Sequence, residues 1–119
     1  TTVSRAGLTD PAAKEAGGLS GRPVFQRNTA MLGRVYKLTG GKVPLIGSGG
    51  IESGETALAK MEAGATLLQL YTGLIYEGAS LIGRMKEHLA RTCAAEGLPS
   101  ISALVGRKAD EWAAKPFAP

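Results

Sequence analysis

Val43-Pro44-Leu45-Ile46-Gly47-Ser48-Gly49-Gly50-Ile51 is the stretch that decides the fold. The run over 43–46 is too short for a helix and is apolar on both faces, which is typical of a parallel strand covered on both sides. Gly47, Gly49 and Gly50 then remove the Cβ atoms where the chain leaves the sheet, so the turn can adopt positive φ and its amides can approach an anion closely. Free N–H groups in such a turn, followed by a helix N-terminus, predict a phosphate site.

The residues after this turn repeat a pattern of helix, strand and helix. Ser53 is the expected N-cap of a helix through Ala63, and Thr66 to Tyr71 forms the next strand. A longer helix then ends near Gly97 and has one apolar face, formed by Leu81, Ile82, Met85 and Leu89. Because strands that alternate with helices form parallel sheets, the chain is predicted to be an α/β protein.

The segments on either side are less regular. Residues 5–27 have no sustained period, and a loop of this length is usually functional. Asn28 or Thr29 is expected to cap the next helix, whose apolar side is Met31, Leu32, Val35, Tyr36 and Leu38. Short outer helices are expected over 101–105 and 109–114, and Thr1 to Ser4 have the character of a strand end. Three strands cannot close a barrel, so residues 1–119 are expected to be one partial domain of a larger fold.

The composition excludes several other classes of protein. With 119 residues and 17 glycines, but only one tryptophan, three tyrosines and two phenylalanines, the chain can form one domain at most. The net charge of +4 comes from scattered basic residues, so no nucleic-acid partner is predicted. A single cysteine, Cys93, excludes an internal disulfide and fits a reducing compartment, and a single histidine, His88, leaves no metal-binding cluster. No apolar run is long enough to span a membrane.

Two polar turns are expected to face each other, because the loops after consecutive parallel strands lie side by side at one edge of a sheet. They are Ser48-Gly49-Gly50 and Tyr71-Thr72-Gly73. In a TIM barrel the loops after strands seven and eight are the usual phosphate pair. Gly49 and Gly50 would offer amides, and Thr72 a hydroxyl and an amide. Tight turns without a ligand use the same glycines, so both interpretations remain open; a Rossmann site is excluded because no G-x-G-x-x-G opens a helix.

The remaining polar residues suggest little chemistry by themselves. Ser20 beside Gly21 could present its hydroxyl to a ligand, although serine next to glycine is also ordinary turn chemistry. His88 falls on the polar side of its helix and is expected to be solvated, whereas Cys93 continues the apolar face and is expected in the core. No residue has a partner that would make it a general base, so the residues alone predict no mechanism.

Four motifs together resemble one known family. They are Thr1-Thr2-Val3-Ser4-Arg5, Gly17-Gly18-Leu19-Ser20-Gly21-Arg22-Pro23, the stretch quoted at the outset, and Ala63-Gly64-Ala65-Thr66-Leu67-Leu68-Gln69-Leu70-Tyr71-Thr72-Gly73. From Thr1 to about Leu89, their order and spacing resemble the C-terminal part of a class 2, quinone-dependent dihydroorotate dehydrogenase. The two glycine motifs are shared with class 1 enzymes. The class 2 assignment depends on the first motif and on residues 69–78.

The resemblance implies a TIM (β/α)8 barrel, of which this chain would hold the end of strand six and strands seven and eight with their helices. It implies an FMN cofactor and the oxidation of dihydroorotate to orotate in pyrimidine (UMP) synthesis. A serine base would take the C5 proton, hydride would pass from C6 to flavin N5, and quinone would reoxidise the flavin. The implied contacts are Ser20 and Gly21 near the flavin, Gly49, Gly50, Tyr71 and Thr72 around its phosphate, and Thr1 against the pyrimidine.

The resemblance also places several functional groups outside these residues. The serine base, the flavin-contacting lysine, the substrate-binding asparagines and the N-terminal helices that meet quinone and membrane would lie upstream of Thr1. No catalytic residue and no metal ligand is therefore expected in this chain, and the protein is expected at the cytoplasmic face of the inner membrane as a peripheral protein. The alternatives are a non-catalytic phosphate- or flavin-binding module and a fragment of a class 1 enzyme or another phosphate-binding barrel. The residues upstream of Thr1 would distinguish these alternatives: a serine base would indicate class 2, a cysteine class 1, and neither residue a non-catalytic binding module.

Overall fold

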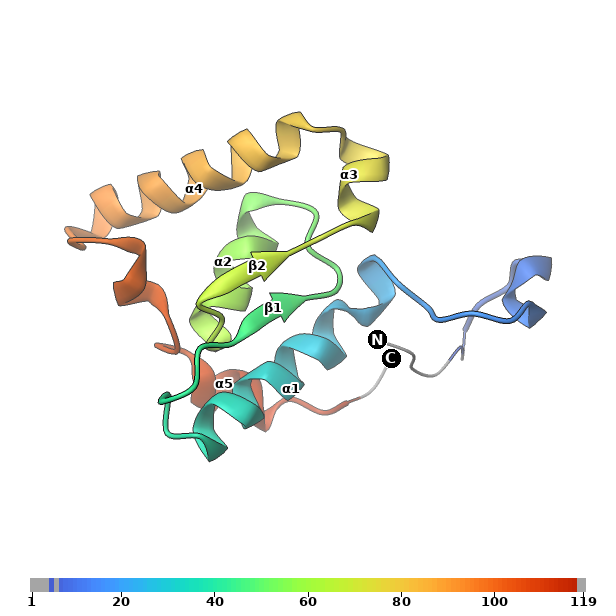
Figure 1. Ribbon diagram of the computed structural model, residues 1–119, viewed down its shortest axis with the longest axis horizontal. Coiled ribbons are helices and arrows are strands. Elements are labelled where there is room, and N and C mark those ends of the chain that lie inside the picture. Colours follow the sequence, from blue (N-terminus) through green and yellow to red (C-terminus); the bar gives the residue numbers. More distant parts are fainter. Residues whose placement is uncertain (1–4, 6, 118–119) are drawn as a thin grey trace.

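The computed structural model describes residue 5 and residues 7–117, so the strand end expected at Thr1 to Ser4 lies outside the described residues. Two strands lie at the centre, with helices around them (Figure 1). The two strands and the three longer helices are α1 (Phe25–Leu38), β1 (Ile46–Ser48), α2 (Gly54–Ala63), β2 (Leu67–Gln69) and α4 (Ser80–Glu96). The short ones are α3 (Thr72–Glu77), α5 (Ala109–Ala114) and the 3-10 helices η1 (Pro11–Lys14), η2 (Arg22–Val24) and η3 (Ile101–Leu104).

The two strands are parallel, as expected, and α2 connects them. Their register pairs Ile46 with Leu67 and Gly47 with Leu68. Gly47 is buried, but Ile46 is 58% exposed and Leu67 63% exposed, so one face of the sheet is uncovered. The expected strand over 43–46, covered on both faces, is therefore wrong in position and in burial. Pro44 gives the reason for the position, because it has no N–H to donate to a ladder.

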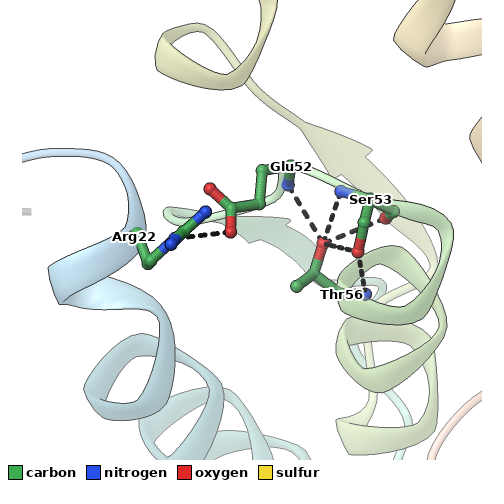
Figure 2. A network of polar contacts seen from close by, with 4 residues as sticks. All are labelled: Arg22, Glu52, Ser53 and Thr56. Atoms are coloured by element: carbon green, nitrogen blue, oxygen red, sulfur yellow. Dashed lines mark hydrogen bonds and ion pairs between the residues drawn. The ribbon is translucent and has the colours of Figure 1, made fainter. Parts of the chain in front are cut away.

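Helix α2 begins where the sequence predicts. Ser53 is its N-cap: the Thr56 amide donates to Ser53 Oγ over 3.1 Å, and the Ser53 amide donates to Thr56 Oγ1 over 2.9 Å (Figure 2). This reciprocal pair satisfies two donors that the first turn would otherwise leave free. Gly64, with φ of 130°, follows the last residue and ends the helix. The start of α2, directly after the glycine turn, is thus fixed by local chemistry.

Helix α1 begins earlier than expected. It starts at Phe25, directly after η2, and has no side-chain cap, so the prediction of Asn28 or Thr29 as N-cap is wrong. Thr29 is buried inside the helix, and its hydroxyl donates to the Phe25 carbonyl over 2.6 Å. Threonine in a helix interior commonly bonds one turn back in this way.

The buried side of α1 also differs from the expected one. Thr29, Ala30 and Gly33 are buried, whereas Met31 is exposed and Leu38 is 87% exposed. The cause is α5, which packs closely on α1: a Cβ at Gly33 would lie 3.0 Å from the Ala109 carbonyl oxygen. Small residues in α1 therefore set the side on which α5 docks.

Helix α4 packs on α2 through one residue per turn. The buried positions are Leu81, Met85, Leu89 and Cys93, which confirms Cys93 as a core residue, while Ile82 is exposed, contrary to expectation. The helix ends at Gly97, as predicted, and this glycine adopts the left-handed conformation. The two short helices predicted in the tail are present as η3 and α5. None of the described helices is long and apolar enough to cross a membrane.

Candidate functional site

Three segments meet at the carboxyl ends of β1 and β2. They are the glycine turn after β1, the start of α3 after β2, and the loop that leads into η2. Together they line a cavity of about 170 Å³, and its lining includes all six expected contact residues that the structure describes: Ser20, Gly21, Gly49, Gly50, Tyr71 and Thr72. The two polar turns thus face each other, as parallel strands require. Thr1, expected at the substrate, lies outside the described residues.

The loop before η2 touches the turn after β2 directly. Ser20 Oγ and Thr72 Oγ1 are 3.0 Å apart and share a hydrogen bond across 52 residues of sequence. Gly21 has φ of 79°, and a Cβ there would lie 3.0 Å from Thr72 Cγ2. A side chain at position 21 would therefore push the loop away from Thr72, and so the glycine holds the two segments together.

Gly49 and Gly50 are required for a reason that the sequence did not reveal. Both have positive φ, 92° and 74°, as expected for the turn. A Cβ on Gly50, however, would lie 2.5 Å from the Cβ of Phe25, and a Cβ on Gly49 would overlap the Asn28 side chain. The space that glycine leaves free is thus filled by the start of α1 and not by a ligand. One side of the glycine turn packs against α1, and its other side faces the cavity.

Several amides around the cavity have no hydrogen-bond acceptor among the described residues. Among the described residues, the turn and loop hydrogen bonds include none donated by the amides of Gly49, Gly50, Tyr71 or Thr72. No described residue that lines this cavity carries a carboxylate. A cavity with free N–H groups, one threonine hydroxyl and no negative charge is suited to an anion.

An ion pair connects the loop to the helix after the glycine turn. Arg22 Nε donates to Glu52 Oε1 over 2.7 Å, and the Glu52 amide donates to Thr56 Oγ1 in the cap of α2 (Figure 2). Both residues line a larger cavity of about 610 Å³, which shares Ser20, Gly50 and Thr72 with the smaller one. Because Arg22 is highly exposed, the pair contributes at most about 1 kcal/mol and mainly orients the two segments.

Three residues depart from their expected setting. Tyr71 lines the cavity but is 79% exposed as a residue, so most of its ring lies in solvent. Thr72 is the first residue of α3, a short helix that the sequence did not predict. His88 is half-buried and not fully solvated, because it packs over Gly54 at the start of α2. Among the described residues no cluster of His, Cys, Asp or Glu could hold a metal ion.

Sequence reasoning missed one residue behind the glycine turn, Lys60 on α2. It is 0% exposed, and its Nζ donates to the Ser48 carbonyl over 3.1 Å. The ammonium also lies 5.1 Å from the centre of the Phe25 ring. Burial lowers the pKa of Lys60 to about 8, so the ammonium form still predominates at neutral pH. The available signal was its spacing: Lys60 follows Ala57 by three residues and precedes Met61, and all three lie on the buried side of α2.

Comparisons with known proteins agree on one family. The family model for dihydroorotate dehydrogenase matches residues 1–93. A dihydroorotate dehydrogenase (quinone) of Brucella ovis is 52% identical over 97% of this chain, and one of Chelativorans is 48% identical over 99%. In both cases the chain spans 32% of the relative's length.

Solved structures agree with the sequence relatives. Ligand-free dihydroorotate dehydrogenase of Eimeria tenella superposes with a TM-score of 0.82 and 34% identity, covering 91% of this chain and 30% of that one. The complex of that enzyme with ferulenol gives the same TM-score and identity. Part of a TIM barrel fits these neighbours, while the numbering of the strands stays a prediction. The chain belongs to the dihydroorotate dehydrogenase family, with quinone-type enzymes among its relatives.

Proposed function

We propose that these 119 residues are the C-terminal part of an enzyme that oxidises dihydroorotate to orotate, with FMN as cofactor and a quinone as acceptor. In this proposal they form one partial domain of a TIM barrel, containing the end of strand six and strands seven and eight. The observation that supports it is the convergence of Ser20-Gly21, Gly49-Gly50 and Tyr71-Thr72 on one cavity. The same cavity is lined by backbone amides and by the hydroxyls of Ser20 and Thr72, which are groups suited to bind an anion.

The residues present fit the phosphate end of FMN. The amides of Gly49 and Gly50 and the hydroxyl and amide of Thr72 would bind the phosphate, since none of these amides is used in the described turns. Ser20 and Gly21 would lie near the flavin ring, with Ser20 already held by Thr72. When bound, FMN supplies the two-electron redox chemistry. The work of this chain is to hold the cofactor in one orientation and to keep the phosphate end out of water.

Apart from Thr1, the rest of the site is assigned to other parts of the protein. The family resemblance, and not the lining of the 170 Å³ cavity, is the reason why the proton acceptor, a serine, is proposed upstream of Thr1. Thr1 would contact the pyrimidine. An upstream N-terminal region would meet quinone and the cytoplasmic face of the inner membrane, and no nucleic acid takes part.

Transient kinetics of the two half-reactions test this function in the full-length protein. Dihydroorotate should bleach the flavin absorbance under anaerobic conditions, and a quinone should restore it, whereas fumarate and NAD should not. Thr1→Ala should slow the bleaching about 10-fold or more, the effect of losing one hydrogen bond to substrate, and should leave reoxidation unchanged.

The other outcomes separate the alternatives. Reoxidation by fumarate or NAD in place of quinone would identify a class 1 type of enzyme. Flavin that dihydroorotate never bleaches would indicate a binding module without this activity. If Thr1→Ala slowed reoxidation as much as bleaching, Thr1 would not be a substrate contact.

A further inference from the structure

Lys60 carries a buried positive charge that has no carboxylate partner among the described residues. The ion pairs among those residues do not include Lys60. Within the described residues, its ammonium group contacts only the Ser48 carbonyl and the Phe25 ring. Burying an ammonium group with so few partners is unfavourable. An unbranched apolar side chain such as methionine would fill the same space without that cost, so packing alone does not account for a lysine at this position.

The hydrogen bond from the Lys60 ammonium to the Ser48 carbonyl affects the direction of the next amide. The Ser48 carbonyl and the Gly49 N–H belong to one peptide unit, and in a planar trans peptide they point in opposite directions. The described residues contain no cis peptide bond. Because Lys60 draws the Ser48 oxygen toward the buried side of β1, the Gly49 N–H is directed to the other side, where Ser48, Gly49 and Gly50 line the 170 Å³ cavity.

The charge itself has a second consequence. Among the described residues, the lining of the 170 Å³ cavity includes no lysine or arginine, and its amides and hydroxyls carry only partial charges. The buried ammonium lies directly behind the turn, bonded to the residue before Gly49, and the low-dielectric surroundings transmit its field more strongly than water would. A phosphate group carries nearly two negative charges at neutral pH and would be attracted to such a field.

We propose that Lys60 is a positioning residue for phosphate: its ammonium group holds the Ser48 carbonyl, directs the Gly49 amide into the cavity and supplies the positive charge that the lining lacks. The inference rests on the proposed function, because it concerns the same FMN phosphate. Lys60 does not touch the phosphate in this account. It acts through the peptide unit between Ser48 and Gly49.

A comparison of FMN with riboflavin tests this role, since riboflavin has the same ring system and no phosphate. Dissociation constants for both are measured by fluorescence quenching on the full-length protein stripped of flavin. Lys60→Met should weaken FMN binding about 10- to 100-fold, the range expected for one hydrogen bond to a charged group, and should leave riboflavin binding unchanged. Lys86→Met, at an exposed lysine of α4, is the control and should change neither constant.

Lys60→Gln is the second variant and serves also if the methionine variant does not fold. Its amide can still donate to the Ser48 carbonyl but carries no charge, so its loss of FMN preference should be intermediate. Equal weakening of FMN and riboflavin in a folded variant, or no weakening of either, would show that Lys60 has only a structural role. If the unaltered protein binds FMN no better than riboflavin, the phosphate site itself is refuted and the proposed function with it.

Discussion

Gly50→Ala should strip the flavin from the full-length protein. The new Cβ would lie 2.5 Å from the Cβ of Phe25 and 3.0 Å from its backbone nitrogen, so the turn or the start of α1 must move. Alanine is also unfavourable at φ of 74°. Overpacking and left-handed strain together should cost about 2–5 kcal/mol, and the resulting movement would displace the amides that would hold the phosphate.

Gly78→Ala provides a matched control for this variant. Gly78 has φ of 76°, nearly that of Gly50, but a Cβ there would meet no atom within 4 Å. An alanine there would also be strained by the positive φ, but it would not collide with any neighbouring atom. The measurement is the ratio of flavin absorbance to protein absorbance after purification, with circular dichroism to verify folding. A Gly50→Ala protein with full flavin content would refute the role of this turn, and equal loss in both variants would assign the effect to strain alone.

Glu62→Gln should give the largest loss of stability among single polar substitutions. The buried Glu62 carboxylate accepts from Arg107 Nε over 2.8 Å and lies 3.1 Å from Lys108 Nζ, and its own carbonyl accepts from the Lys108 amide. These contacts hold the segment between η3 and α5 on α2. Neutralising the buried acid leaves two cations with less compensation, which should cost about 2–4 kcal/mol because Arg107 and Lys108 remain partly exposed.

Urea unfolding of the full-length protein measures this cost, and Glu87→Gln is its control. Glu87 pairs with Arg91 one turn later on α4, and both side chains are largely exposed. Pairs of that kind contribute about 0.3–0.5 kcal/mol, so the control should shift the unfolding midpoint only slightly. Similar shifts for the two variants would mean that the Glu62 contacts do not anchor the tail. The hydrogen bonds to Glu96 and Glu62 raise the pKa of Arg107, so the arginine stays charged throughout the accessible pH range.

The local chemistry of the chain made part of the fold predictable. Ser53 and Thr56 fix the start of α2 through two short-range bonds, and Gly64 and Gly97 end their helices, so these boundaries follow from neighbouring residues. The start of α1 could not be found in the same way, because no side chain caps it and the preceding 3-10 turn determines where it begins.

The candidate site was likewise predictable in part. The facing turns follow from the parallel order of the strands, so the grouping of Gly49, Gly50 and Thr72 was predictable. The burial of Lys60 and the close packing of Phe25 on Gly50 depend on how α1 and α2 lie against β1. The hydrophobic periodicity of the sequence does not encode this arrangement. In the same way, the exposed Leu38 reflects the docking of α5 from more than 70 residues away in the sequence.

The packing of the glycine turn on α1 also limits how this sequence can diverge. The atoms that a Cβ on Gly50 would meet include the Cα of Phe25, at 2.8 Å, and its backbone nitrogen, at 3.0 Å, and every amino acid has these atoms. No replacement at position 25 could make room for a side chain at 50. The nearest atoms for Gly49 all belong to the side chains of Asn28 and Val24, which smaller residues would clear away. Compensating change is therefore open to position 49 at the cost of backbone strain, and closed to position 50.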